Sequence, residues 1–259
     1  NSIEMPMVAR EEEDLGGVLV TCWLPVLEGM ADAARKSRYP SVRQHALSML
    51  TDAIIDRHGR DVPKDELCGI LDRICIPLAG SRMVDLLRSG TDPAEHHHHV
   101  EEIMIELELC ISLIFKPFLH HLRTLLTMRE EFVAIWMSML GVMTELLGEE
   151  VVRPTHGGTE GDDYPGGHAM TRDKLLLTTK ELGSEHLRNA IMVLVASGVL
   201  RGEGKTSSGD GGSFARGGGE DVSALTWNAI GRMKFCRQYV EEWKQSASAE
   251  GGEAGTSEG

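Results

Sequence analysis

Residues 18–55 read VLVTCWLPVLEGMADAARKSRYPSVRQHALSMLTDAII. In both halves of this stretch apolar residues recur at steps of three and four, which places them on one face of an α-helix. Residues 37–41 (Ser-Arg-Tyr-Pro-Ser) interrupt the pattern, and Pro40 suits the first turn of a new helix. Because each helix has an apolar face to bury, we predict an antiparallel hairpin. Its first helix covers about 15–36, with a kink at Pro25, and its second ends near residue 57.

The rest of the chain repeats this pattern. Apolar stripes predict further helices over about 62–87 (interrupted by Pro77), 94–122 (kinked at Pro117), 132–147, 172–182, 185–197 and 223–244. Ser184 is the expected N-cap of the helix over 185–197, and Gly198 is its expected stop. No stretch alternates with the period of a strand. The sequence therefore predicts an all-α fold, a HEAT-like α-solenoid of antiparallel helical hairpins.

Glycine, proline and charge divide the chain into seven predicted segments. They are an N-terminal extension (1–14), helical repeat hairpins (15–147), a long Gly-rich flexible loop (148–171), a helical hairpin (172–201), a second Gly-rich flexible loop (202–222), a terminal helix (223–244) and a disordered C-terminal tail (245–259).

The charge of the chain excludes one broad class of partner. It has 26 Lys and Arg against 40 Asp and Glu, a formal net charge of −14. Binding nucleic acid over a wide surface requires clustered basic residues, so no nucleic-acid partner is expected. The same acidity argues against a polybasic contact with lipid.

The cysteines and the apolar runs indicate where the protein resides. The five cysteines (Cys22, Cys68, Cys75, Cys110 and Cys236) form no C-x-x-C pair, which is typical of buried thiols in a reducing compartment. The longest uncharged apolar run, 109–115, is far shorter than the roughly 20 residues that span a bilayer. We expect a soluble intracellular protein that is a segment of something longer.

Several motifs in one order carry a resemblance to a known family. Trp23-x-Pro25-x-Leu27-x-Gly29-Met30-Ala31 is followed by Val42-Arg43-x-x-Ala46-Leu47-x-x-Leu50. Further matches are Phe132-x-x-x-Trp136-x-x-Met139-Leu140, Glu185-x-Leu187-x-Asn189-x-x-x-Val193-Leu194, Ser197-Gly198-Val199-Leu200 and Leu225-Thr226-Trp227. Over about residues 17–243 this resembles the helical region downstream of the catalytic domain in large Arf guanine-nucleotide exchange factors. The order and spacing resemble the Golgi brefeldin-resistance type, the GNOM and Gea proteins.

The sequence departs from that family in two places. Ser37-Arg38-Tyr39 stands where the family has Asp-x-Arg before the Val-Arg pair, and the loops 148–171 and 202–221 are longer. These departures affect partner contacts through those segments, and the expected fold is unchanged.

The resemblance implies a non-catalytic regulatory or scaffold region in Golgi vesicle-mediated transport. The exchange domain lies upstream in such proteins, so no catalytic residue, cofactor, metal or small-molecule substrate is expected here. The implied partners are proteins of the Golgi trafficking machinery, with Arf and Rab GTPases as candidates, at the cytoplasmic face of Golgi membranes. The signature residues, with a structural or a partner-binding role, are Trp23, Pro25, Gly29, Val42, Arg43, Ala46, Leu47, Trp136, Leu187, Asn189 and Trp227.

Other candidate sites have simpler interpretations. Gly202-Glu203-Gly204-Lys205-Thr206 resembles a phosphate loop, but position 199 is Val199 instead of the required glycine. His96–His99 with Glu95, Glu101 and Glu102 could supply metal ligands, although a second Glu-x-x-His motif is missing. We interpret the first as a loop, the second as a surface tract, and His120-His121 as residues at a helix end. Arg43 is either a structural cation paired with a carboxylate of another hairpin or a contact for a partner.

Three functional alternatives remain open from the sequence. The first is a general solenoid adaptor that is unrelated to Arf. The second is a nucleotide-using enzyme built around Lys205, and the third is direct lipid binding through an amphipathic helix.

Overall fold

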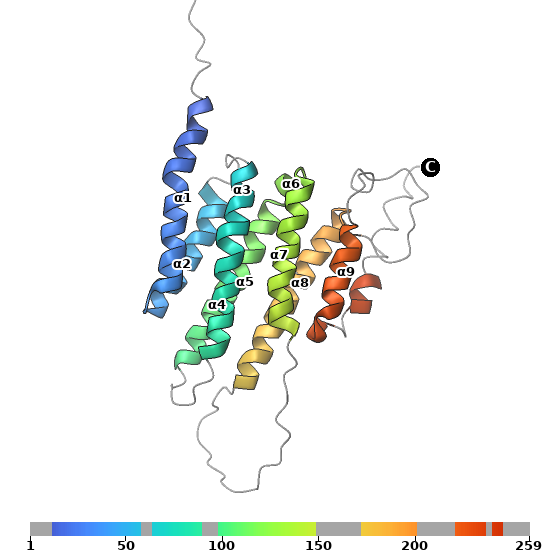
Figure 1. The fold of residues 1–259 in the computed structure, drawn as a ribbon. Coiled ribbons are helices and arrows are strands. Elements are labelled where there is room, and N and C mark those ends of the chain that lie inside the picture. Colours follow the sequence, from blue (N-terminus) through green and yellow to red (C-terminus); the bar gives the residue numbers. More distant parts are fainter. Residues whose placement is uncertain are drawn as a thin grey trace, which may run out of the picture.

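The structure, a computed structural model, describes residues 12–57, 64–89, 98–148, 172–200, 221–236 and 240–245. Within these ranges every regular element is a helix and no strand occurs, so the predicted all-α class is confirmed (Figure 1). Apart from their end residues, the predicted Gly-rich loops (148–171 and 202–222) and the predicted tail (245–259) lie outside the described residues.

The α-helices are α1 (Glu12–Lys36), α2 (Pro40–Asp52), α3 (Lys64–Ile70), α4 (Ile76–Ser89), α5 (His98–His120), α6 (Leu122–Leu125), α7 (Arg129–Gly148), α8 (Arg172–Ala196) and α9 (Val222–Arg232). A π-helical turn, Ala53–Arg57, extends α2, and a second, Leu71–Cys75, joins α3 to α4. A 3-10 turn, Lys234–Cys236, follows α9, and residues 240–245 are helical.

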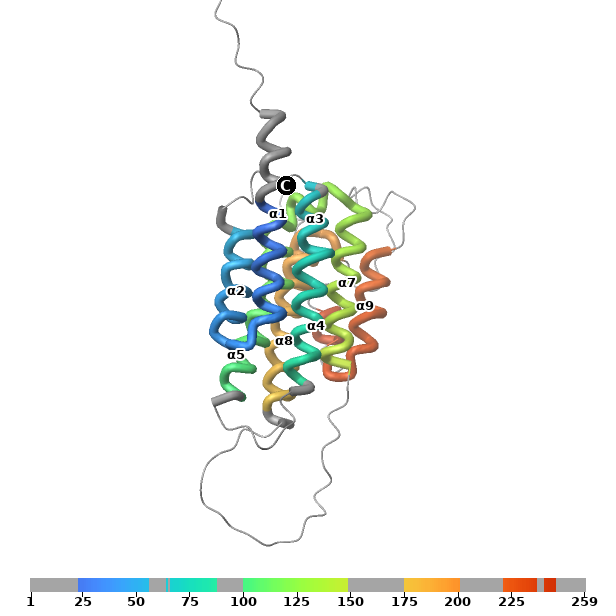
Figure 2. The backbone as a smooth tube through the Cα atoms, turned by 60° about the vertical axis from the view of Figure 1, so that its left-hand side comes forward, coloured from blue at the N-terminus to red at the C-terminus, as the bar shows by residue number. Residues whose placement is uncertain are grey.

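The helices form two layers of side-by-side elements. One layer holds α1, α3 with α4, α7 and α9, and the other holds α2, α5 and α8 (Figures 1 and 2). Each helix packs on its hairpin partner, α1 on α2, α4 on α5 and α7 on α8. Successive hairpins also pack against each other through α2 with α5 and α5 with α8. We call these the first (α1–α2), second (α3–α4 with α5) and third (α7–α8) hairpins.

The turn of the first hairpin forms where the sequence predicted it. Tyr39 is extended (φ −93°, ψ 119°), as expected of a residue that precedes proline, and Pro40 opens α2. The Tyr39 N–H donates to Ser37 Oγ at 3.2 Å. The two helices can therefore pack antiparallel with a connection of three residues.

Helix α7 lies in the middle of the fold. By length and composition it is apolar enough to cross a membrane. In this structure α7 instead packs against α4, α8 and α9. The Trp136 ring stacks on Phe118 at 5.5 Å, and Phe118 stacks on Phe132 at 5.9 Å. Because Phe118 belongs to α5, these contacts bury α7 against the other layer and make it a core helix.

The predicted hairpin over 172–201 is wrong, because α8 is one continuous helix. Gly183, which looks like a breaker, lies where α8 approaches α7. A Cβ at Gly183 would lie 3.0 Å from Leu146 Cδ2 and 3.0 Å from Met143 Cε. Ser184 is not an N-cap, because its Oγ donates to the Glu181 carbonyl at 2.8 Å within the helix. The predicted stop is confirmed, since Gly198 has a φ of +71°.

Two other predicted boundaries are corrected. Pro77 does not interrupt its helix. The π-helical turn immediately before it widens the backbone and makes room for the proline ring. The terminal helix predicted over 223–244 begins at Val222, with Asp221 as N-cap, and ends at Arg232. Met233 is extended and buried there, so the chain turns to bury Met233 and Cys236 in place of continuing the helix.

Gly183→Ala is expected to destabilise the fold by about 1–3 kcal/mol, because the new methyl group overpacks the contact between α8 and α7. Gly141→Ala, in α7, is the matched control. Nothing lies within 4 Å of a Cβ at that position, so the better helix former should stabilise by about 0.5–1 kcal/mol. Urea unfolding of both variants measures these changes. Equal effects at the two glycines would contradict the close approach.

Candidate functional site

Many of the signature residues lie in the first hairpin, on two different sides of it. Gly29, Val42 and Ala46 line a groove between α1 and α2. Arg43 and Leu47 lie on an adjacent side of α2, where Arg43 reaches α5 and Leu47 is fully buried. Elsewhere on α1, Trp23 is half-buried and Pro25 is exposed within the continuous helix. The signature thus combines positions that hold the hairpin to its neighbour with positions that face outward.

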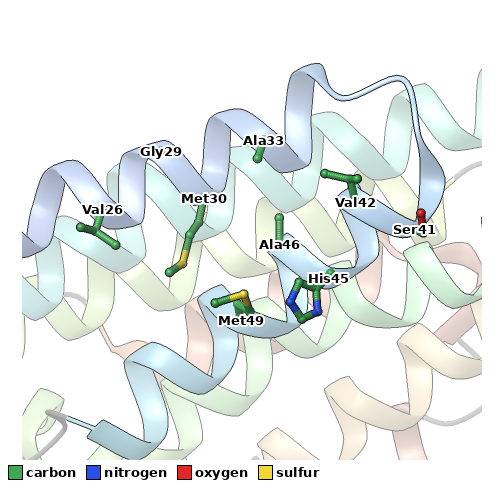
Figure 3. A pocket seen from close by; sticks show the side chains of 9 residues that line it. All are labelled: Val26, Gly29, Met30, Ala33, Ser41, Val42, His45, Ala46 and Met49. Atoms are coloured by element: carbon green, nitrogen blue, oxygen red, sulfur yellow. The ribbon is translucent and has the colours of Figure 1, made fainter.

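The groove between α1 and α2 has a volume of about 640 Å³. Figure 3 shows side chains from both helices directed into it, with Met30 and Met49 pointing toward each other. Its lining is Val26, Gly29, Met30 and Ala33 from α1, and Ser41, Val42, His45, Ala46 and Met49 from α2.

This lining is apolar and accessible. Val26, Val42 and Met49 are 44%, 45% and 43% exposed, which is high for large apolar side chains. Ala46 is buried at the floor, and a Cβ at Gly29 would meet nothing within 4 Å. A cavity with an apolar lining and small residues at its base suits the packing of another apolar side chain. It lacks the convergent charged groups of a catalytic site.

A buried ion triad lies on the other side of α2. Glu106 of α5 is 1% exposed, and its carboxylate is held between Arg43 and Arg82, whose side chains are each 12% exposed. Arg43 Nε donates to Oε1 at 3.0 Å and to Oε2 at 3.1 Å, and Nη2 donates to Oε2 at 2.9 Å. Arg43 Nη1 also donates to the Ser37 carbonyl at 3.1 Å. Arg43 is therefore paired with a carboxylate of another hairpin, and its role toward a partner stays a prediction.

Arg82 completes the triad from α4. Its Nε donates to Glu106 Oε1 at 2.9 Å, and its Nη2 contacts the same oxygen. The exposed Asp85 lies 4.0 Å from Arg82 Nη1. One carboxylate thus joins α2, α4 and α5. Planar guanidinium groups suit such multiple contacts, so the triad fixes how the first two hairpins pack.

The remaining signature residues do not join this site. Trp136, Leu187 and Trp227 are buried in α7, α8 and α9, whereas Asn189 is exposed on α8. Trp136 Nε1 donates to Thr226 Oγ1 at 2.8 Å, which links α7 to α9 beside Trp227. These three buried residues belong to the core, and the structure does not gather the signature into one pocket.

Sequence reasoning missed Glu106 and Arg82. A signal was present, because Glu106 stands between Ile103 and Leu107 in the most apolar helix of the chain. A carboxylate at the core face of a helix is almost never fully buried unless it is paired, so it predicts a cationic partner. Which arginine supplies the pair depends on tertiary packing across 63 and 24 residues.

His121 is a second buried polar group that joins the first two hairpins. Its ring is buried, and Nε2 lies 3.0 Å from the Ile54 carbonyl oxygen in the π-helical turn after α2. A carbonyl can only accept, so Nε2 carries the proton. Burial is the main cause that lowers the pKa of His121 below 6.5, with the neighbouring His120 adding to it, although the bond to Ile54 opposes the shift. His121 is therefore a structural residue at the end of α5.

Acidification is expected to weaken the fold through His121. A folded pKa below 6.5 means that the unfolded chain binds the proton more readily, so the contribution is complete above pH 6.5 and is lost as the pH falls toward the folded pKa. His121→Gln keeps a donor for Ile54 and removes the titration. The free energy of unfolding between pH 7 and pH 5 should then depend less on pH than in the unchanged protein. His45→Gln, at an exposed position, is the control, and identical pH profiles for the three proteins would contradict the assignment.

The other two candidate sites from the sequence, the loop around Lys205 and the tract around His96–His99, lie largely outside the described residues. The loop around Lys205 lies outside them, as do Glu95, His96 and His97. No group of three or more His, Cys, Asp or Glu that could hold a metal occurs in the part of the chain that the structure describes. Cys68, Cys75, Cys110 and Cys236 are buried, and burial raises the pKa of Cys75 and of Cys236 to about 12. Such thiols are inert.

The geometry agrees with a comparison of the sequence with known families. A family model described as "GBF1-like, tetratrico peptide repeat region" matches residues 23–235. This description gives tetratrico peptide as the repeat type, where the sequence predicted a HEAT-like one. Both are arrays of stacked helical hairpins. The chain has no significant match among curated proteins or among solved structures.

Proposed function

Because the chain belongs to the GBF1-like tetratrico peptide repeat family, we propose that it is a non-catalytic helical region of a GBF1-type Arf guanine-nucleotide exchange factor. The observation that carries the proposal is the family match over residues 23–235, which contains all three stacked hairpins but for the start of α1. The region regulates or supports exchange in Golgi vesicle-mediated transport, and the exchange chemistry belongs to a separate upstream domain.

The mechanism is geometric. A solenoid of hairpins holds the surfaces at its two ends at a defined separation. Here the ion triad around Glu106 fixes the second hairpin to the first, and the bond from Trp136 to Thr226 fixes α9 to α7. A stiff region of this kind positions the exchange domain relative to the membrane and to partner proteins.

The partners of the region are proteins of the Golgi trafficking machinery, with Arf and Rab GTPases as candidates. The proposed location is the cytoplasm, at the periphery of Golgi membranes. A net charge of −14 favours contacts with proteins over contacts with anionic lipid. Glu101 and Glu108 of α5 and Glu181 and Glu185 of α8 are exposed carboxylates. No cofactor or nucleic acid is part of the proposal.

Deleting this region from the exchange factor tests the proposal. Nucleotide exchange on Arf loaded with GDP is measured in solution, and recruitment is measured on Golgi membranes in cells. We expect exchange in solution to be retained and recruitment to be lost, because the region positions the protein and does no chemistry.

The measurement in solution is also the control for folding of the exchange domain. Loss of exchange in solution would place the region in the catalytic machinery and contradict the proposal. Unchanged recruitment and exchange would show that the region does not position the protein, and would also contradict the proposal.

A further inference from the structure

We propose that the α1–α2 groove holds another helical hairpin of the same exchange factor, stacked on the first hairpin on the side away from the second. The inference rests on the proposed function and identifies an internal contact for a surface that this function leaves unassigned.

Helix α1 is apolar on two adjacent sides. Leu27, Ala31 and Ala34 are buried within the fold. A second row, Val26, Met30 and Ala33, lines the groove. Neighbouring residues such as Val26 and Leu27 are about 100° apart around a helix, so the two rows cannot face the same element. A helix that needs only one buried side is polar elsewhere, and α1 is apolar over a wider arc than that.

Helix α2 has the same construction. Its buried side carries Leu47 and Leu50, while Val42 and Met49 are exposed in the groove. Outside these two rows α2 carries Ser48 and Asp52, whose side chains lie 3.5 Å apart on the exposed surface. Solvent-facing positions on this helix are therefore polar, and the exposed apolar row stands out as a surface that packs against protein.

The contacts between the described hairpins show how such a surface is filled. Where the second hairpin meets the third, a Cβ at Gly80 in α4 would lie 3.1 Å from Val142 Cγ2 in α7. A small residue in one hairpin thus receives a branched side chain from the next. In the groove, Gly29 of α1 has the same character, but nothing lies within 4 Å of a Cβ there. The groove thus offers the first hairpin a small residue of the kind that receives a side chain in the stacking interface, and it is open.

These features define the occupant. It presents an amphipathic helix with aliphatic side chains at helical spacing, one of them above Gly29 and others between Val26, Val42 and Met49. The groove has polar groups at Ser41 and His45 and no cluster of charge. A hairpin of the same repeat type meets this description, since repeat proteins bury a continuous core by stacking neighbours.

Thiol labelling tests the inference in two proteins, the chain of residues 1–259 and the longer exchange factor that contains it. Met49→Cys places a reporter in the groove on a Cys22→Ser background, and the described native cysteines are buried. Ile105→Cys, on α5, is the matched control, because Ile105 is 44% and Met49 43% exposed. Maleimide is the probe. In the longer protein we expect Met49→Cys to react at least about tenfold more slowly, and Ile105→Cys to be unchanged.

Each other outcome overturns the inference. Equal labelling of Met49→Cys in the two proteins means that the groove is open, whatever the recruitment assay gives. Protection that already occurs in the isolated chain and grows with its concentration assigns the groove to a second copy. Slower labelling at both positions shows a cover that is not specific to the groove. The two proposals can also fail separately. If the deletion experiment contradicts the proposed function but Met49→Cys is protected in the longer protein, the stacked hairpin still stands.

Discussion

Glu106→Ala is expected to lower the free energy of unfolding by about 3–5 kcal/mol, the cost of breaking a buried ion pair by removing one partner. The variant leaves Arg43 and Arg82 facing each other with no carboxylate between them, and both side chains are 12% exposed. Two uncompensated cations in a nearly dry site repel each other and are poorly hydrated. The first hairpin should therefore separate from the second before the rest of the fold unfolds.

Urea unfolding measures this loss, and two variants serve as controls. Asp85→Ala removes an exposed carboxylate 4.0 Å from the same Arg82, so it should cost less than about 1 kcal/mol. Glu106→Gln keeps the shape and acceptor oxygen but removes the charge, so its cost should lie between those of the other two variants. A loss below 1 kcal/mol for Glu106→Ala would contradict the triad as the joint of the first two hairpins.

The triad is not expected to be the most stable solution for this site. Replacing all three members with apolar residues, as in Arg43→Met with Arg82→Met and Glu106→Leu, should leave stability nearly unchanged or raise it. These substitutions remove the attraction between the charges, but they also remove the cost of desolvating three charged groups. The comparison with Glu106→Ala separates the cost of an unpaired charge from the value of the pair.

The second large effect is expected for Trp136→Ala, which should cost about 3–5 kcal/mol. Trp136 is fully buried in α7, and its ring stacks on Phe118 at 5.5 Å. The truncation leaves a cavity between the layers, and Thr226 Oγ1 loses the donor that lies 2.8 Å away. Helix α9 should therefore loosen from α7, which hydrogen exchange of residues in α9 would detect.

A double-mutant cycle separates the hydrogen bond from the packing. Thr226→Val and Trp136→Phe each remove one side of the bond, and the pair should show a coupling of about 0.5–1.5 kcal/mol. Thr226 Oγ1 also donates to the Val222 carbonyl at 2.7 Å, so Thr226→Val carries a small local cost of its own. Additive effects of the two substitutions would show that the contact adds nothing beyond burial.

Periodicity predicted the helices and their pairing because it depends on which side of each helix is buried. The stripe of Phe132, Trp136 and Met139 gave α7 correctly. Local breakers were less informative. Gly183 and Ser184 suggested a boundary, and only the distance to Leu146 shows that Gly183 is there for close packing.

The site depended on information that periodicity lacks. Val26 and Leu27 both fell in one apolar stripe, although one faces the groove and the other the core. Pairing with a carboxylate was one of two interpretations of Arg43, but the carboxylate lies 63 residues away and only packing selects it. Whether the apolar row in the groove is exposed likewise depends on which elements pack beside it, and periodicity does not give that information.

The joints between hairpins also differ in their resistance to deformation. Between α2 and α5 the charged groups of the triad resist displacement, because moving them apart exposes charge in a site with little water. Between α5 and α8, Phe115 stacks on His186 at 5.8 Å, and Thr179 Oγ1 lies 3.9 Å from Met104 Sδ. Neither of these contacts is an ion pair, so displacing them leaves no buried charge without its partner. When the stacked hairpins are bent by an applied force, the bending should therefore concentrate between the second and third hairpins.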